Sequence, residues 1–307
     1  MTEERRGTAY GVACYFLWGL FPLYWPLLEP AGSVEILGHR IVWSLAFVLG
    51  VLAARRSWSW VRPLLDDPVS LARMTLAAVL IAGNWCLYIW GVNNEHVVET
   101  SLGYFINPVV TVLIGVLVLQ ERLRPMQWGA VGLGALAVVV LTVDYGRPPW
   151  IALGLAFSFA TYGLLKKQVG ARVGAVQSLT VETAVLFLPA LGWLVYLESQ
   201  GGGQLGHSGV GHGLLLASAG VATAVPLLFF AAAARRVPLS LLGMLQYLAP
   251  VLQFLTGVLL YDEPMPASRL AGFALVWAAL AVLTADGLRN RRRVRRADRL
   301  EAVHTYA

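Results

Sequence analysis

Charged residues are scarce in this sequence. Only 13% of its 307 residues are Asp, Glu, Lys or Arg, whereas 58% are hydrophobic. A soluble protein of this length needs far more polar surface, so the composition excludes an ordinary soluble globular chain. It predicts an all-α polytopic membrane protein instead.

Cysteine is nearly absent as well. Cys14 and Cys86 both lie in apolar runs, and neither belongs to a CxxC or Cys/His cluster. This placement argues against metal binding and redox chemistry and favours ordinary packing. The patterns GxxxxGK[ST], HExxH and GxSxG are also missing, which argues against a nucleotide-driven pump. We therefore predict no metal, no cofactor and no enzyme activity.

Long apolar runs, in contrast, recur along almost the whole chain. A helix that crosses a bilayer needs about 20 mostly apolar residues. The connections between the runs are short, as in an antiparallel helical bundle. We predict about ten spans, at 8–29, 34–54, 71–92, 98–119, 126–143, 150–166, 176–197, 210–233, 239–260 and 267–285.

Basic residues are unevenly distributed between the predicted connections. If the N-terminus lies inside, only Arg147 and Arg269 of the 23 Lys and Arg residues fall outside, and Arg40 falls within a span. The other 20 lie inside, as the positive-inside rule requires, so we predict that both termini are cytoplasmic. The basic tail, residues 289–307, could bind nucleic acid. We favour contact with anionic lipid headgroups and predict no nucleic-acid partner.

The two halves of the chain resemble each other. A shift of 142 residues aligns the predicted spans, one with six and two with seven, and also superimposes identical residues. These are Pro108 with Pro250, Gly115 with Gly257, Glu121 with Glu263, Thr142 with Thr284 and Asp144 with Asp286. Five spans per half force the second half to enter from the opposite side, an arrangement common in secondary transporters and also found in channels and a few membrane enzymes. We predict two inverted five-helix repeats, residues 1–146 and 147–288.

Polar and small residues form a stripe in the fourth span, within SLGYFINP and the residues that follow. Ser101, Tyr104 and Pro108 are spaced three and four apart, and the shift maps Tyr104 onto Gln246 and Pro108 onto Pro250. Such stripes occur as helix-packing faces, but two at matching depth favour a central cavity. We predict that Pro108 and Pro250 kink their helices near the middle of each span.

Other polar and aromatic residues fall at similar depth. Asn84 and Tyr88 share one face of the third span, and they are flanked by Trp85. We expect aromatic side chains to contact an amphipathic or ring-bearing solute and amides to donate and accept hydrogen bonds. The predicted cavity-lining residues are Trp18, Asn84, Trp85, Tyr88, Ser101, Tyr104, Asn107, Gln246 and Gln253.

Three ionisable side chains are predicted inside spans: His39, Arg40 and Glu182. Arg40 could extend to the membrane surface and pair with Glu29 or Glu35, or it could be functional. Glu182 is too short to do so and has no partner in its own span, so we predict a proton- or cation-responsive group. The shift maps Arg40 onto Glu182.

Several segments resemble one known family. GNW (83–85), VNN (92–94), SLGYFINP (101–108), ERLRPMQW (121–128) and ALGLAFSFATYGL (152–164) are similar to the RarD-like, chloramphenicol-sensitive-protein group. That group belongs to the EamA branch of the drug/metabolite transporter superfamily. The resemblance covers nearly the whole chain. It implies a multi-pass permease of the bacterial inner membrane, with both termini cytoplasmic and no settled substrate.

The sequence thus predicts a secondary transporter of small organic metabolites or drugs that works by alternating access. Two alternatives stay open: an integral-membrane enzyme that acts on a lipid-linked substrate, and a passive channel. The enzyme would need a reactive cluster at one interface, and the channel would conduct without saturation. Oligomeric state, coupling ion and direction of transport stay open.

Overall fold

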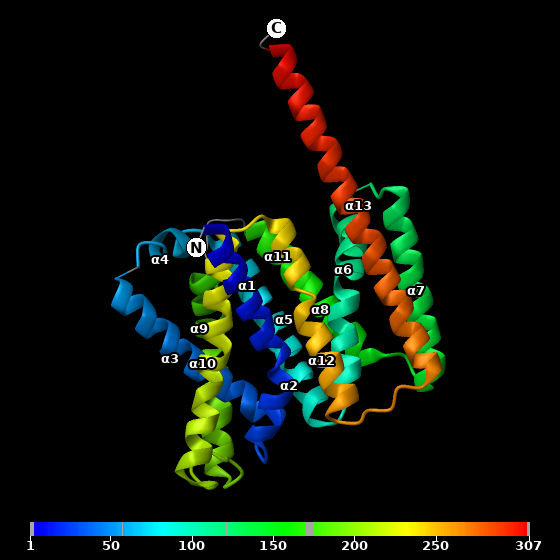
Figure 1. The fold of residues 1–307 in the computed structure, drawn as a ribbon. Helices are drawn as coiled ribbons and strands as arrows, with labels where there is room; N and C mark the ends of the chain where they lie inside the picture. Colours follow the sequence, from blue (N-terminus) through cyan, green and yellow to red (C-terminus); the bar gives the residue numbers. More distant parts are fainter. Residues whose placement is uncertain (1–2, 57, 121, 170–174, 306–307) are drawn as a thin grey trace.

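The computed structural model describes residues 3–56, 58–120, 122–169 and 175–305, and all regular secondary structure in these ranges is helical (Figure 1). Glu121, one member of the predicted repeat, lies outside the described residues. Side chains beyond residue 290 also lie outside them, so the structure does not test the predicted lipid contact of the basic tail. The all-α class is confirmed.

Fourteen helical segments follow one another along the described chain. They are α1 (Glu3–Gly19), α2 (Phe21–Tyr24), η1 (Trp25–Leu28), α3 (Ser33–Arg55), α4 (Val61–Leu65), α5 (Pro68–Asn93), α6 (Val97–Leu119), α7 (Pro125–Tyr145), α8 (Trp150–Val169), α9 (Ala175–Ser199), α10 (Gly209–Ala234), α11 (Leu239–Leu245), α12 (Leu248–Leu259) and α13 (Ala267–Thr305).

The predicted spans coincide with these helices. Seven of the described helices are long and apolar enough to cross a membrane, and the bent pair formed by α1 with α2 and η1 makes an eighth. The remaining two predicted spans correspond to shorter apolar helices, Trp150–Lys166 and Leu248–Leu259. The protein is therefore a multi-pass membrane protein of about ten spans. The last candidate span covers Ala267–Asn290, close to the predicted 267–285, and helix α13 continues past it to Thr305.

The first span is broken rather than continuous. The chain bends by 45° between Gly19 and Phe21. Pro22 and Pro26 follow the bend, and each lacks the N–H that a continuing α-helix would use. The freed carbonyl of Pro22 accepts a hydrogen bond of 2.8 Å from the Tyr261 hydroxyl. A side chain of the second half thus satisfies a backbone group that the first half leaves unpaired.

The two mid-span prolines behave differently from each other. Pro108 lies inside α6, which is not interrupted there. Pro250 lies in the first turn of α12, where a missing N–H costs nothing, and the interruption falls at Gln246 and Tyr247. The two repeats therefore differ here, because α6 continues through Pro108 while the ninth span is interrupted shortly before Pro250. Each proline lacks the N–H that would bond to the carbonyl four residues earlier. This carbonyl belongs to Tyr104 for Pro108 and to Gln246 for Pro250.

Helices that are equivalent in the two halves pack in equivalent ways. The last helix of each half, α7 and α13, lie side by side, and α5 packs on α8 as α1 packs on α10 (Figure 1). Two ion pairs join α7 and α13 near their opposite ends. Arg269 Nε donates to Asp144 at 2.9 Å, and Arg124 Nε donates to Asp286 at 2.8 Å. Asp144 and Asp286 are repeat equivalents, whereas Arg124 aligns with Pro266 and Arg269 with Gln127, so the two ion pairs are similar but not identical contacts.

Close helix contacts depend on glycine at two of these junctions. A Cβ on Gly220 of α10 would lie 2.3 Å from the backbone carbon of Trp43 in α3. A Cβ on Gly257 of α12 would lie 3.1 Å from the backbone nitrogen of Val98 in α6. Both helix pairs approach too closely for any larger residue, as is common in membrane bundles.

We predict that Asp144→Asn lowers the free energy of unfolding by about 1–3 kcal/mol, because it leaves the Arg269 guanidinium without its carboxylate. Thermal unfolding of the detergent-solubilised protein measures this. The matched control is Glu3→Gln, which removes an exposed ion pair with Arg236 and is expected to change stability by less than about 0.5 kcal/mol. Equal effects of the two substitutions would contradict a clamping role for the α7–α13 pairs.

Candidate functional site

Arg40 lies at the centre of a group of buried aromatic side chains. It is the eighth residue of α3, about 10 Å along the helix, and only 4% of it is exposed. Its guanidinium carbon lies 3.9 Å from the Trp85 ring centroid, 5.2 Å from that of Trp25 and 5.8 Å from that of Phe21. We call Phe21, Trp25, Arg40, Trp85 and Tyr88 the Arg40 cluster. Cation–π contacts of this kind stabilise a desolvated guanidinium by about 2 kcal/mol or more.

A polar network adjoins the Arg40 cluster and joins α5, α6 and α8. Asn84 Nδ2 donates to the Leu155 carbonyl at 3.0 Å and to Ser158 Oγ at 2.8 Å. The Tyr104 hydroxyl donates to Asn84 Oδ1 over a long 3.5 Å, and its ring lies edge-on to Tyr88 with centroids 5.6 Å apart. The network therefore bridges the halves, because Asn84 and Tyr104 belong to the first and Ser158 to the second.

Trp18 and Gln253 extend this region towards α1 and α12. Gln253 Nε2 donates to the Trp18 backbone carbonyl at 3.1 Å, while its Oε1 is buried without a hydrogen-bond partner. The Trp18 ring packs both against the apolar core that contains Tyr88 and against the core around Tyr15. Seven of the sequence-predicted residues thus lie in one continuous region: Trp18, Arg40, Asn84, Trp85, Tyr88, Tyr104 and Gln253.

Other predicted residues are not joined to that region by any contact described in the structure. Ser101 is fully buried and donates to the Val98 carbonyl of its own helix at 2.7 Å, as a packing residue does. The Gln246 side chain lies in hydrogen-bonding contact with the Tyr247 hydroxyl. Asn107 Oδ1 is buried without a partner. The polar stripe therefore divides between packing and the candidate site.

His39 and Arg40 are neighbours in sequence but face different surroundings. His39 Nε2 lies 3.9 Å from Glu35 Oε1, and that carboxylate also accepts the Gln204 backbone N–H at 2.6 Å. His39 and Glu35 line a groove of about 250 Å³ whose other wall includes Leu194 of α9. The expected pairing of Arg40 with Glu29 or Glu35 was wrong, because Arg40 points into the aromatic cluster instead.

Glu182 is not isolated, contrary to the sequence interpretation. Its Oε1 accepts from Lys166 Nζ at 2.8 Å, Ser178 Oγ at 2.9 Å and the Tyr162 hydroxyl at 3.1 Å. Lys166 lies in α8, which packs near the start of α9, and no pattern within one span reveals this contact. The network removes the reason for assigning Glu182 to proton or cation sensing, since the carboxylate is compensated where it lies.

Two further carboxylates were missed as site-shaping residues. Glu99 accepts from Arg147 Nη2 at 2.8 Å and from the Ile151 N–H at 3.2 Å, at the start of α8. Glu263, in the connection before α13, accepts the Val98 N–H at 2.9 Å at the start of α6. Burial raises the pKa of the Glu263 carboxyl above its ordinary value, although the backbone N–H donors act against this. The match of Glu263 with Glu121 in the repeat was the available signal.

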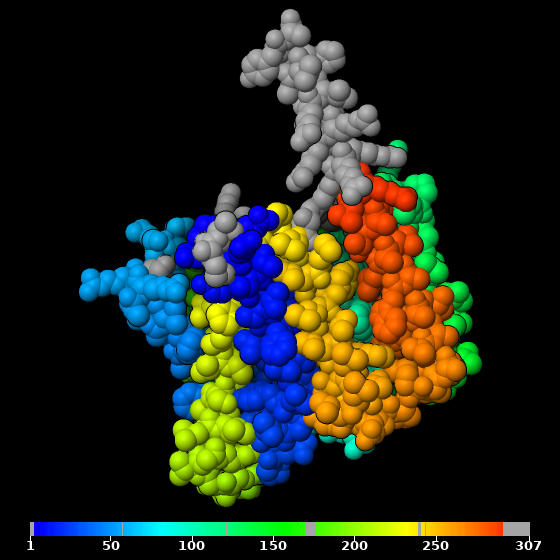
Figure 2. Space-filling model, in the orientation of Figure 1, coloured from blue at the N-terminus to red at the C-terminus, as the bar shows by residue number. Residues whose placement is uncertain are grey.

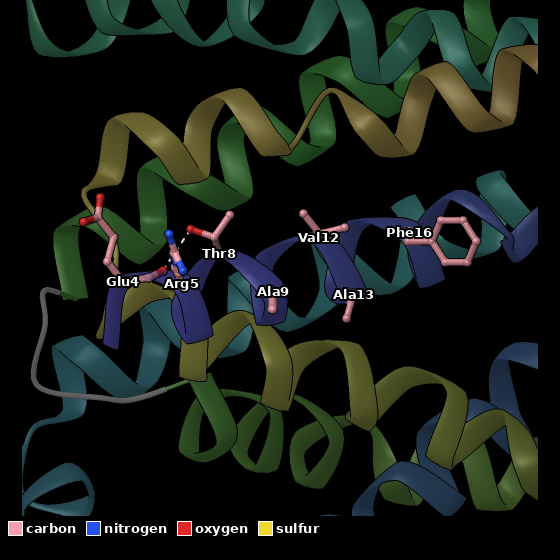
Figure 3. Close-up of a pocket in the computed structure, with 7 residues that line it drawn as sticks. All are labelled: Glu4, Arg5, Thr8, Ala9, Val12, Ala13 and Phe16. Carbon is pink, nitrogen blue, oxygen red and sulfur yellow. Dashed lines mark hydrogen bonds between the residues drawn. The ribbon is translucent and has the colours of Figure 1, made fainter. Parts of the chain in front are cut away.

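A separate groove runs along the outer face of α1 (Figure 3). Its lining is mainly apolar, with Ala9, Ala13 and Phe16 along its length and Glu4 at one end. The opposite face of α1 packs through Gly11 against Leu245, so the groove faces away from the bundle. Figure 2 shows α1 uncovered on this side of the molecule. None of the predicted cavity-lining residues borders this groove.

Comparison with known proteins gives the family. Residues 5–143 and 148–285 each match the model of the EamA-like transporter family. Protein RarD of Streptomyces exfoliatus is 61% identical over 301 residues, covering 98% of this chain and 94% of that protein. The uncharacterized transporter YojE of Bacillus subtilis is 43% identical over 289 residues, covering 92% of this chain and 94% of that protein. One crystal structure shares the fold, with a TM-score of 0.57 at 20% identity, covering 91% of this chain and 97% of that one. The RarD-like resemblance is thereby confirmed, and the chain belongs to the EamA-like transporter family.

Proposed function

We propose that this protein is a secondary transporter of small organic molecules that works by alternating access around the Arg40 cluster and the adjoining Asn84–Tyr104 network. The observation that carries this proposal is the position of the network, which joins Asn84 and Tyr104 of one half to Ser158 of the other. A solute bound there touches both halves. Motion of one half against the other then changes the side from which the solute is reached.

The contacts at the two ends of the bundle support this mechanism. At one end, Glu263 and Tyr261 of the second half bond to the backbone of α6 and of the first span. At the other end, Arg124 of the first half pairs with Asp286 of the second. We infer that one set of contacts is broken in each open state. The two states have similar energies, because the halves are repeats of one structure.

The experiment that tests this function is solute exchange in proteoliposomes. We expect saturable uptake and counterflow, in which an excess of unlabelled solute inside accelerates entry of the labelled solute. Amphipathic, ring-bearing solutes, amphenicols among them, form the first panel. Flux without saturation or counterflow would support a passive channel. Turnover of a lipid-linked substrate without flux would support a membrane enzyme.

We propose that the protein lies in the bacterial inner membrane with both termini cytoplasmic. The 20 basic residues assigned to one side motivate this orientation. The start of α1 and the end of α13 lie at the same end of the bundle, as the proposal needs (Figure 1). Reporter fusions after Ala307 and within the 201–206 loop should report opposite sides of the membrane. Signals from the same side would contradict the topology.

Tyr104 belongs to the network, and its repeat equivalent Gln246, which no described contact joins to that network, is proposed to contact the solute from the other half. We expect Tyr104→Phe and Gln246→Leu each to weaken solute binding roughly threefold to tenfold, since a hydrogen bond is worth about 0.5–1.5 kcal/mol. Binding affinity and unfolding temperature are measured on the same preparations. Tyr196→Phe is the matched control, because that side chain is 54% exposed on α9. Loss of stability without loss of affinity would make these residues packing groups.

A further inference from the structure

Arg40 differs from the other buried charged side chains of the described structure. Glu35, Glu99, Glu182 and Asp286 each accept at least one hydrogen bond. Arg40 has no hydrogen bond or ion pair among the described residues, and its Nε is buried without a partner. The contrast with Glu182 is the sharpest, because the two are repeat equivalents. Lys166 compensates the charge of Glu182, while no carboxylate compensates that of Arg40.

The aromatic rings stabilise the charge of Arg40 but cannot accept its N–H groups. At 3.9 Å from the ring centroid, the guanidinium carbon lies over the face of Trp85. Guanidinium N–H bonds lie in the plane of the group and point outward from its edge, where they fit a carboxylate or phosphate in a two-pronged contact. A buried charge without such a partner is destabilising, so its presence in a membrane span indicates function.

The other unpartnered groups of the Arg40 cluster are also donors. Trp25 Nε1 is fully buried and has no hydrogen-bond partner, and an indole can only donate. The Tyr88 hydroxyl is buried without a partner, and its ring lies in the same core as Phe21 and Trp25, which contact Arg40. Three groups that can donate, from η1, α3 and α5, therefore gather in one apolar cluster, and of these the Tyr88 hydroxyl alone can also accept.

We propose that the Arg40 cluster binds the carboxylate of an organic acid, and that such anions are the solutes this protein transports. Arg40 supplies the charge and two parallel N–H donors, Trp25 and Tyr88 supply further donors, and the faces of Trp85 and Phe21 contact the apolar body of the acid. The inference rests on the proposed function and names its solute class. Phosphate shares the anion chemistry, but the aromatic walls favour a carboxylate attached to an apolar body.

The test is thermal unfolding of the full-length protein in detergent, with benzoate and phenylacetate as probes and benzamide and phenylacetamide as neutral controls of matched shape. We expect the carboxylates to raise the unfolding temperature by about 2 °C or more at concentrations well above Kd, and the amides to leave it unchanged. Arg40→Met should abolish the carboxylate response. It should not lower the unfolding temperature of the protein alone, because it removes an uncompensated buried charge.

Arg147→Met is the control variant. It removes an arginine that does have a carboxylate, Glu99, so it should lower the unfolding temperature and leave the carboxylate response intact. Should Arg40→Met not fold, Arg40→Lys keeps the charge without the two-pronged geometry and is expected to weaken the carboxylate response roughly tenfold. A carboxylate response in Arg40→Met or Arg40→Lys equal to that of the unmodified protein would overturn the proposal.

Two results with the unmodified protein would also overturn it: no response to either carboxylate, or a response to inorganic phosphate alone. These outcomes are distinct from failure of the proposed function, since binding is measured without transport. Saturable uptake of neutral solutes, together with an unfolding temperature that carboxylates do not change, would contradict carboxylate binding at Arg40 and still support a transporter. A carboxylate response without any flux would support binding at Arg40 and contradict the transporter function.

Discussion

Hydrocarbon offers no hydrogen-bond partners, so polar groups within the spans of this protein depend on other parts of the chain. The constraint explains most of the long-range polar contacts in the structure. Glu99 binds Arg147 and the start of α8, and Glu263 binds the start of α6. The Tyr261 hydroxyl donates to the Pro22 backbone carbonyl, which lies just after the bend in the first span. Each contact joins segments far apart in sequence and fixes how the helices are arranged.

Three buried polar groups of the Arg40 cluster lack such partners, and each lowers the stability of the folded protein. Arg40 Nε, Trp25 Nε1 and the Tyr88 hydroxyl gather around one cationic side chain. Natural binding sites commonly retain such local destabilisation, because a ligand that supplies the missing contacts then binds more tightly. The Glu182 network shows that the same bundle can compensate a buried charge with its own side chains.

The sequence predicts much of the fold, because the length of each apolar run and the distribution of Lys and Arg can be read from single segments. The repeat can be read by aligning the two halves of the sequence. The site was less predictable, because it depends on which helix lies beside which. Trp18, Asn84, Trp85, Tyr88 and Tyr104 are singled out by the sequence and lie in one region of the structure, since polar and aromatic residues at membrane depth are conspicuous in a sequence. The contact of Glu182 with Lys166 and the aromatic surroundings of Arg40 are not evident in the sequence, because each depends on side chains from other helices. Equal kinks at Pro108 and Pro250 were expected from symmetry, but local sequence around each proline differs.

The reciprocal ion pairs of α7 and α13 have a consequence for the origin of the chain. Each helix carries an arginine at its beginning, Arg124 or Arg269, and an aspartate further along, Asp144 or Asp286. A helix with this arrangement is complementary to an antiparallel copy of itself. Two antiparallel copies of such a helix form one ion pair at each end across a twofold axis between identical subunits. In the present chain the aspartates keep equivalent positions, while Arg124 aligns with Pro266 and Arg269 with Gln127, so the two halves have diverged in these arginines as they have at Arg40 and Glu182.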